Sequence, residues 1–246
     1  MVKKHWSYKS GRVVCTIAIM GAWSNAHAQS SGSNVISLGW AHIAPQSSST
    51  PLTVTSIGGR PVNVAQPGAT GAAGTADTFG IVSEHYFSDN IGVALAGGWP
   101  VRLPVYGRGT LAQYGKIGEA IPMAPQLFLR YHLGTAQTNF RPFVGLGVNY
   151  SWFTDEQVTN SNFLTQNFGP GGSASIKASS SWNPVFEAGA NYAIDKHWLV
   201  GFNVSYLPAK TTATLTGHTA SGVEVVIQTK VKVCPIDTFL NVSYVF

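Results

Sequence analysis

Residues 143–153 read Phe-Val-Gly-Leu-Gly-Val-Asn-Tyr-Ser-Trp-Phe, and their side chains alternate strictly between two kinds. One set is bulky and apolar and runs from Val144 through Leu146 to Trp152, whereas the set between them is glycine, asparagine and serine. A period of two residues indicates a β-strand with two different faces. A small or polar face fits the narrow lumen of a barrel, and a bulky apolar face suits lipid. The stretch therefore predicts a membrane-crossing strand of a β-barrel.

The same alternation recurs along the chain, for example over 91–99 and 126–133. The connections alternate between short turns (87–90, 134–140 and 195–197) and long segments rich in Gly, Ser, Thr, Asn and Pro (46–76, 101–121 and 154–181). Such an alternation is typical of the periplasmic and extracellular ends of outer-membrane barrels. We predict an all-β fold, an eight-stranded antiparallel transmembrane β-barrel with short periplasmic turns and long extracellular loops. Its strands are expected at about 35–45, 77–86, 91–100, 122–133, 141–153, 182–194, 198–216 and 223–246.

The composition points to the same class. Charged residues make up only 10% of the chain, against about 25% in soluble domains. No run of 18 apolar residues exists that would form a membrane helix, and a membrane chain without such helices must close a barrel to satisfy its backbone. Residues 1–28 hold four basic and no acidic residues, so 29–246 carries a net charge of only +1. The basic balance therefore gives no argument for nucleic-acid binding.

The first 28 residues have the pattern of a secretory signal. Four basic residues precede an uncharged, mostly apolar run over 13–23, and small residues stand at Ala26 and Ala28. The run is too short to span a membrane as a helix. We predict a signal peptide at 1–28 and an outer-membrane β-barrel at 29–246, located in the cell outer membrane. Cleavage would leave Cys234 as the only cysteine, which excludes an internal disulfide and a cysteine-based zinc site.

The aromatic residues and the C-terminal strand fit this topology. Two interfacial girdles are expected, with Trp99, Trp152 and Trp182 at the outer rim and Tyr86, Tyr131, Tyr192, Trp198 and Tyr244 at the inner rim. The chain ends on Phe246, which shares one strand face with Tyr244. A terminal aromatic on an alternating strand resembles the signal that the barrel-assembly machinery recognises. We therefore predict Tyr244 and Phe246 as an assembly signal, with that machinery, outer-membrane lipid and lipopolysaccharide as partners.

Five blocks of the sequence together resemble OmpW-type outer-membrane proteins over essentially all of 29–246. They are Trp40, Tyr-Phe-Ser-Asp-Asn-Ile-Gly-Val at 86–93, Pro-Phe-Val-Gly-Leu-Gly-Val-Asn-Tyr at 142–150, Asp-Lys-His-Trp at 195–198 and Tyr-Val-Phe at 244–246. The resemblance implies an eight-stranded barrel with a narrow, largely hydrophobic passage for small apolar molecules, and AlkL-like members are associated with hydrocarbon uptake. The segments 46–76 and 208–235 depart from the family's pattern.

Strand parity points a mixed set of side chains inward. The candidate lumen-lining residues are Glu84, Gln126, Phe128, Arg130, Phe143, Asn149, Phe153 and Glu187, with Asn191 on the same parity. Because charges buried in a narrow lumen should pair, Arg130 is expected to bind Glu84 or Glu187, and a structural plug is favoured over ion conduction. The inward phenylalanines fit an apolar passage, although simple filling of the lumen explains them as well.

The predicted barrel size limits how a solute could cross. Eight strands leave an interior about wide enough for side chains alone, so a porin-like water channel is not expected. A solute would enter a pocket near the outer mouth and leave through the wall into lipid, or follow a very narrow lumen. Prolines remove a ladder donor, so those at the expected outer strand ends either open a lateral gap or merely terminate strands. They are Pro100, Pro104, Pro122, Pro125, Pro184, Pro208 and Pro235.

No catalytic constellation stands out. Lipid A deacylases are also eight-stranded barrels and use a His-x-Ser arrangement, which occurs here only at 5–7, inside the predicted signal. The histidines at 42, 85, 132, 197 and 218 have no metal-ligand spacing. We therefore predict no enzyme, no cofactor and no metal. The predicted function is passive entry of small hydrophobic molecules; the alternatives are a structural or surface-binding barrel that contacts phage, bacteriocin or host through its loops, and a lipid-modifying enzyme.

Overall fold

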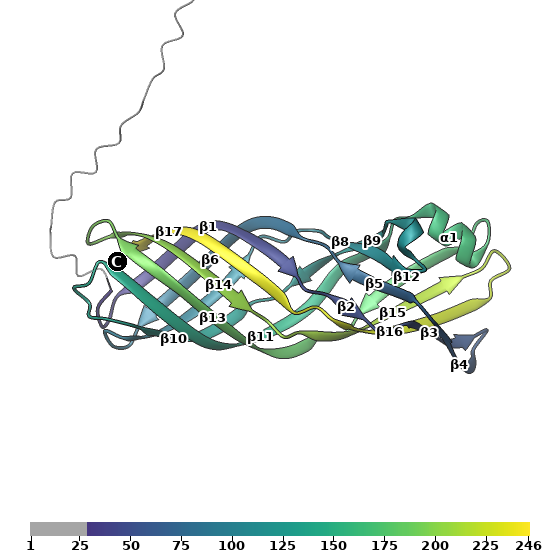
Figure 1. Cartoon of the computed structure of the whole chain (residues 1–246), viewed down its shortest axis with the longest axis horizontal. Helices are drawn as coiled ribbons and strands as arrows, with labels where there is room; N and C mark the ends of the chain where they lie inside the picture. The colour runs from purple at the N-terminus through teal and green to yellow at the C-terminus, as the bar shows by residue number, and fades with distance from the viewer. Residues whose placement is uncertain (1–28) are drawn as a thin grey trace, which may run out of the picture.

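The computed structural model describes residues 29–246, and the signal peptide predicted at 1–28 lies outside these residues. The described chain is an elongated β-structure (Figure 1), with a closed barrel on the side of the C-terminus and a long β-sheet extension on the other. No helix within 29–246 is long and apolar enough to cross a membrane.

Eight antiparallel strands close the barrel, as the alternating sequence predicts. Each pairs with the next, and β1 pairs with both β6 and β17, with Val35 opposite Glu84 on one side and Val245 on the other. The strands are β1 (Asn34–Pro45), β6 (Ala76–Tyr86), β7 (Ile91–Gly98), β10 (Gln126–His132), β11 (Phe140–Val158), β13 (Ser181–Ala193), β14 (Trp198–Tyr206) and β17 (Pro235–Val245). Closure leaves no free sheet edge, so every strand of the barrel has a hydrogen-bonded neighbour on both sides.

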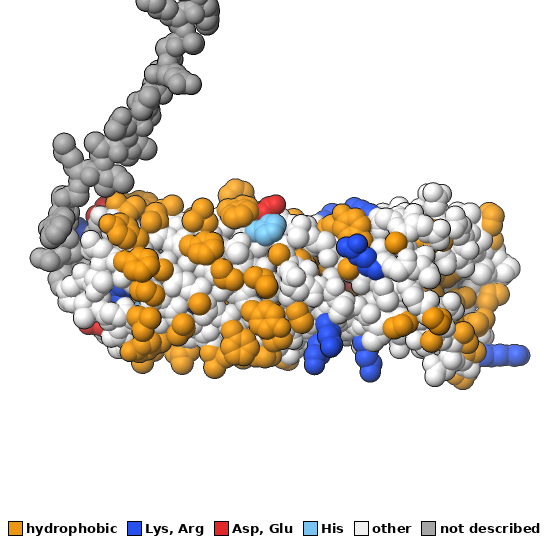
Figure 2. All heavy atoms as spheres, in the orientation of Figure 1, with side chains coloured by type: hydrophobic (Ala, Val, Ile, Leu, Met, Phe, Trp, Pro, Cys, Tyr) orange, Lys and Arg blue, Asp and Glu red, His pale blue; other side chains and the backbone are white. Residues whose placement is uncertain are grey.

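The large apolar side chains of the barrel lie on its outer surface. Phe79 is 78% exposed and Leu146 is 58% exposed, and the inward neighbours are small or polar residues such as Gly80 and Asn149. On the face shown in Figure 2, orange side chains are spread over the barrel half of the molecule. An apolar band on the outer surface of a closed barrel is the surface that lipid requires.

The predicted girdles need one correction. Trp99 and Trp182 are exposed near the extension, and Tyr131, Tyr192, Trp198 and Tyr244 are exposed near the short turns. Trp152 is only half-buried beside Tyr150 and borders the cavity. Tyr86, however, is fully buried inside the barrel. The reason is parity, because Tyr86 lies two residues after the inward Glu84 on β6 and so faces the same side.

The segments predicted as long loops instead form most of a second sheet. Its strands besides the outer part of β11 are β2 (Ser48–Ser49), β3 (Leu52–Ile57), β4 (Arg60–Gln66), β5 (Ala69–Ala73), β8 (Leu103–Gly109), β9 (Lys116–Met123), β12 (Ser173–Ala178), β15 (Lys210–His218) and β16 (Glu224–Lys232). A short 3₁₀ helix, η1 (Ala112–Tyr114), precedes β9. Threonine and valine are frequent in these strands, and both are β-branched residues that favour extended backbone. The barrel wall therefore continues beyond the lipid-facing band.

The last two predicted strands, 198–216 and 223–246, are each broken in two. The chain bends at Leu207–Ala209 between β14 and β15, and at Val233–Cys234 between β16 and β17. Cys234 has a φ of 38°, in the left-handed region, so regular strand geometry cannot continue through it. The two breaks face each other, since the Leu207 N–H donates to the Pro235 carbonyl and the Val233 N–H donates to the Ala209 carbonyl.

Helix α1 (Ser161–Phe168) closes the core of the extension. It begins at Asn160, whose Oδ1 accepts the Phe163 N–H at 2.8 Å and so caps the helix N-terminus. Phe163 and Phe168 are buried together with Leu215 of β15. The extension thus has an apolar interior of its own, continuous with the barrel.

Candidate functional site: an apolar cavity above a charged floor

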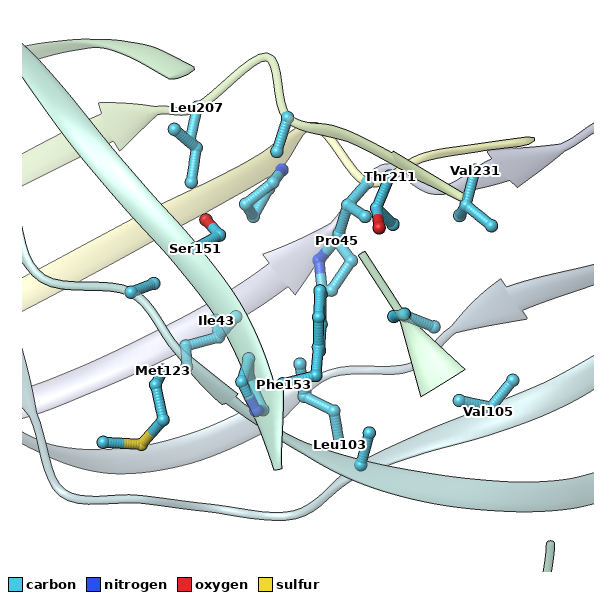
Figure 3. Close-up of a pocket in the computed structure, with 18 of the residues that line it drawn as sticks. Ile43, Pro45, Leu103, Val105, Met123, Ser151, Phe153, Leu207, Thr211 and Val231 are labelled. Atoms are coloured by element: carbon cyan, nitrogen blue, oxygen red, sulfur yellow. The ribbon is translucent and has the colours of Figure 1, made fainter. Parts of the chain in front are cut away.

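A cavity of about 560 Å³ runs from the middle of the barrel into the extension. Its lining is predominantly aliphatic and aromatic and comes from strands far apart in the sequence. Figure 3 labels Ile43, Pro45, Leu103, Val105, Met123, Ser151, Phe153, Leu207, Thr211 and Val231 around it. These residues gather because the inward face of the extension is apolar, whereas that of the barrel is mostly small or polar.

Arg130 forms the floor of this cavity together with two carboxylates. Its guanidinium donates to both oxygens of Glu187, at 2.5 and 3.0 Å, and to Oε2 of Glu84 at 2.9 Å. Asn203 donates to Glu187 at 3.3 Å. The four residues come from β10, β13, β6 and β14, so the network ties strands on different sides of the lumen together. Buried charges that are paired in this way fill the cross-section of the barrel rather than leaving it open.

Two glycines make room for the carboxylates of the floor. A Cβ at Gly92 would lie within 3 Å of Glu84 Oε1, and a Cβ at Gly145 would lie within 3 Å of Glu187 Cγ. The glutamate side chains therefore pass directly over these two backbone positions. Phe143 covers the network from a further strand, with its ring centre 4.7 Å from the Arg130 guanidinium carbon, a cation–π distance.

A second polar layer lies beneath the floor, toward the short turns. His132 Nε2 lies 2.7 Å from Glu84 Oε1, and Nδ1 of the same ring lies 3.3 Å from the Tyr86 hydroxyl. Arg141 is buried and donates to the carbonyl oxygens of Gln29, Asp89 and Leu133. Sequence reasoning missed the roles of these residues. His132 lies on the same strand face as Arg130, and this alternation could have predicted that it points into the lumen. No local sequence feature indicates that Arg141 donates to backbone carbonyls.

The other predicted lumen-lining residues divide between the cavity and the barrel interior. Phe128 is buried at the cavity floor, and Phe153 and Gln126 line the cavity higher up. Asn149 is buried and donates to the Pro125 carbonyl at 3.0 Å, and Asn191 is buried nearer the short turns. The structure thus brings Glu84, Arg130, Glu187, Phe128 and Phe143 into one cluster. Whether this set lines a passage stays a prediction.

The barrel wall has a break beside the cavity, between β7 and β10. Their pairing ends at Ala96 and Gln126, and it resumes farther out where Leu103 of β8 lies opposite Ala120 of β9. No backbone hydrogen bond joins the intervening segments 97–102 and 121–125.

Residues on both sides of this break line the cavity. They are Gly97, Gly98, Trp99, Val101, Pro122, Met123, Ala124 and Pro125. Gly97 is exposed, and a Cβ built there would meet nothing within 4 Å. The cavity therefore reaches the wall at a place where the wall has neither ladder hydrogen bonds nor a side chain at Gly97.

Charges at the level of the extension are paired at its surface. Arg102 Nη1 lies 3.0 Å from Glu119 Oε1, Lys116 lies 2.6 Å from Glu119 Oε2, and Arg102 also pairs with Asp155. The hydrogen bond from Lys116, followed by the nearby Arg102, holds the pKa of the Glu119 carboxyl below its usual range. These ion pairs link Arg102, the residue just before β8, to β9 and β11 beside the wall break.

The C-terminal residues predicted as an assembly signal lie on the outer face of the barrel. Tyr244 is partly exposed, and Phe246 is 63% exposed. The backbone of Phe246 completes the barrel, because its N–H donates to Asn34 and its carbonyl accepts from Asn34, each at 3.0 Å. Their recognition by assembly machinery stays a prediction.

A closed eight-stranded barrel with a lipid-facing apolar band and short turns at one end defines a bacterial outer-membrane β-barrel protein. The model of the OmpW family matches residues 30–246, and the chain belongs to that family. It is therefore an outer-membrane protein, and its relatives are outer-membrane barrels rather than enzymes.

Individual relatives cover most of the chain. Outer membrane protein W of Vibrio cholerae is 27% identical over 207 residues, which are 82% of this chain and 87% of that protein. Outer membrane protein AlkL of Ectopseudomonas oleovorans is 28% identical over 182 residues, 74% of this chain and 71% of that protein. The crystal structure of the outer membrane protein OprG from Pseudomonas aeruginosa has a TM-score of 0.77 at 30% identity, covering 90% of this chain and 99% of that one.

Proposed function

We propose that this barrel gives passive passage to small hydrophobic molecules, which enter the cavity from the extension and leave through the break between β7 and β10 into the membrane. The observation that carries the proposal is the combination of an apolar cavity, a charged floor and a break in the wall at the cavity's side. Each of the three has a separate physical consequence.

The cavity suits a small apolar solute. Its volume of about 560 Å³ falls in the range of roughly 300–1,000 Å³ that is usual for small-molecule pockets. Leucine, isoleucine and valine side chains line it from both sheets, for example Leu103, Val231 and Ile43. Transfer of an apolar molecule from water into such a lining is favourable because apolar surface leaves water on both partners.

The charged floor disfavours the route straight through the barrel. A solute moving past Arg130 would have to separate it from Glu84 and Glu187 in a buried site. Breaking a buried ion pair costs about 3–5 kcal/mol. An apolar solute has no charged or hydrogen-bonding group that could replace the lost interactions. Below the floor the lumen is filled again by the Tyr86, His132 and Arg141 layer.

The wall break supplies the alternative exit. Proline has no N–H to donate, so Pro122 and Pro125 cannot complete a ladder on their side of the break, and Pro100 cannot on the other. A solute leaving there passes between strands without breaking a backbone hydrogen bond and enters lipid directly. The hydrocarbon uptake that the family resemblance implies is consistent with this route.

The test compares entry of an apolar fluorescent probe, N-phenyl-1-naphthylamine, into bacterial cells carrying different variants. Gly97 lies on the outer face, on the parity of Leu95 and opposite Ile81, and an added Cβ there meets no atom within 4 Å. Gly97→Trp should therefore at least halve the rate that the wild-type protein adds, because the indole would cover the break from the lipid side. Val226→Trp is the matched control. It adds the same side chain on the outer face of β16, away from the break, and should leave the rate unchanged.

A third variant separates the two routes. Phe128→Ala enlarges the lumen at the floor, and it should change the entry rate far less than Gly97→Trp does if the solute leaves through the wall. An unchanged rate in Gly97→Trp with a faster rate in Phe128→Ala would favour the lumen instead. If wild-type cells take up the probe no faster than cells without the protein, the passage function itself is wrong.

A further inference from the structure

Four exposed lysines share the outer face of three neighbouring strands in the extension. Lys177 lies on β12, Lys210 on β15, and Lys230 and Lys232 on β16. The register places Lys210 directly opposite Lys232, Thr212 opposite Lys230, and Lys177 opposite Thr214. We call these four residues the lysine patch.

The lysine patch has no acidic partner among residues 29–246. None of the four lysines forms a salt bridge there, in contrast to Arg102, Lys116 and Arg130. The residues between them on the same face, Thr212, Thr214 and Gln228, are neutral and carry hydrogen-bond donors. Like charges directly opposite each other on paired strands are destabilising. The Lys210–Lys232 pair therefore costs stability unless an anion lies between the two ammonium groups.

The position of the lysine patch relative to the membrane indicates which kind of anion it meets. Tyr206, the last outward aromatic of β14, lies four residues before Lys210, and Ile236 lies four residues after Lys232. Four residues of extended chain span at most about 13 Å, and the bends at Leu207–Ala209 and Val233–Cys234 shorten this distance. The headgroup layer begins where the aromatic girdle ends. Figure 2 shows Lys and Arg side chains (blue) next to the orange band on its extension side. The lysine patch thus lies at the level of the outer-leaflet headgroups.

We propose that the lysine patch binds the phosphate groups of lipid A, the phosphorylated glucosamine anchor of lipopolysaccharide in the outer leaflet. Phosphate groups at this depth neutralise Lys210 and Lys232 together, and the neighbouring threonine hydroxyls donate further hydrogen bonds. The acyl chains of the same molecule pack on the apolar band below. Strand parity places the four lysines on the outer face of the wall, although Lys210 also borders the cavity. The proposal does not rest on the proposed passage.

The experiment measures lipid A bound to the folded protein by native mass spectrometry in detergent, with bisphosphorylated lipid A as the probe. The wild type should retain it, and Lys210→Gln/Lys232→Gln should bind about tenfold more weakly, because each surface lysine contributes a few-fold to attraction of an anionic lipid. Lys196→Gln is the matched control. It removes the same charge from an exposed position at the opposite end of the barrel and should not change binding.

Two further probes identify the chemistry that is recognised. Dephosphorylated lipid A should bind the wild type no better than it binds Lys210→Gln/Lys232→Gln, and inorganic pyrophosphate should not displace lipid A at equal concentration. The proposal is overturned if the double variant binds like the wild type, if Lys196→Gln weakens binding equally, or if pyrophosphate alone competes fully. Should the double variant fail to fold, Lys177→Gln/Lys230→Gln is measured against the same three criteria.

Discussion

Arg130 and Glu187 form a two-pronged ion pair inside the barrel, with Nε donating to Oε1 at 2.5 Å and Nη2 donating to Oε2 at 3.0 Å. The planar fork of the guanidinium matches the carboxylate, which fixes both side chains in one geometry. Because β10 and β13 are separated by β11 in the barrel, this pair acts across the lumen and not along a ladder. The floor of the cavity is therefore a property of the closed barrel rather than of any one hairpin.

Arg130→Met should destabilise the barrel strongly. The change leaves the carboxylates of Glu84 and Glu187 buried without their cation, and removing one partner of a buried ion pair costs about 3–5 kcal/mol. Urea titration of unfolding in lipid vesicles measures the loss. Arg102→Met is the control, since it removes an arginine from exposed ion pairs and should cost about 0–1 kcal/mol. Equal losses in the two variants would mean that the floor is not a buried network.

Val148→Arg tests which face of the barrel meets lipid. Val148 is 50% exposed on the outer face of β11, and an arginine at mid-height there should cost roughly 2–4 kcal/mol in vesicles. Val226→Arg makes the same change on the outer face of β16 in the extension, beyond the apolar band, and should stay within about 0.5 kcal/mol of the wild type. If Val226→Arg is the more costly change, the extension rather than the band lies in lipid.

The alternating sequence predicts the eight barrel strands and the inward face of each, which is why Glu84, Arg130 and Glu187 could be named together. The alternation along a strand shows which face of the sheet a side chain lies on. It does not show how far along the barrel axis that side chain lies. The sequence therefore leaves the partner of Arg130 open between two carboxylates, whereas Arg130 binds both. Tyr86 shows the converse error, because its aromatic character suggested a girdle while its parity with Glu84 buries it.

The extension was harder to predict for a different physical reason. Its strands pair with segments far away in the chain, such as β16 with β3 and β12 with β15. Such pairing depends on tertiary contacts that local alternation does not encode. The break at Val233–Cys234 has a similar origin, since a positive φ at a cysteine is set by its surroundings and not by its residue type. These distant strands contribute to the cavity lining, for example through Ile176 of β12 and Ile227 of β16.

Phe246→Ala should lower the amount of assembled barrel in cells. Phe246 is 63% exposed on the last strand, so its side chain contributes little to packing and its loss reports mainly on recognition during assembly. The measurement is the heat-modifiable band on gels of outer membranes. Phe87→Ala is matched to it, because Phe87 is 64% exposed and lies in a turn at the same end of the barrel. Equal levels of folded protein in both variants would remove the argument for a C-terminal signal.

The turn between β13 and β14 should respond to acid through Asp195. Its Oδ1 accepts the backbone N–H groups of His197 and Trp198 at 2.7 and 2.8 Å, and these two bonds hold the pKa of the carboxyl below its usual value. Since the folded pKa is the lower one, the stabilisation is fully present above the unfolded pKa of about 4 and is lost as the pH falls through the folded pKa. Protection of the His197 and Trp198 amides from hydrogen exchange, corrected for intrinsic rates, should therefore be constant from neutral pH to about pH 4 and fall below it.

Asp195→Ala should lack this protection at every pH. Asp195→Asn keeps an acceptor oxygen that does not titrate, so its protection should persist in acid. If Asp195→Asn loses protection over the same acid range as the wild type, then another group controls the turn.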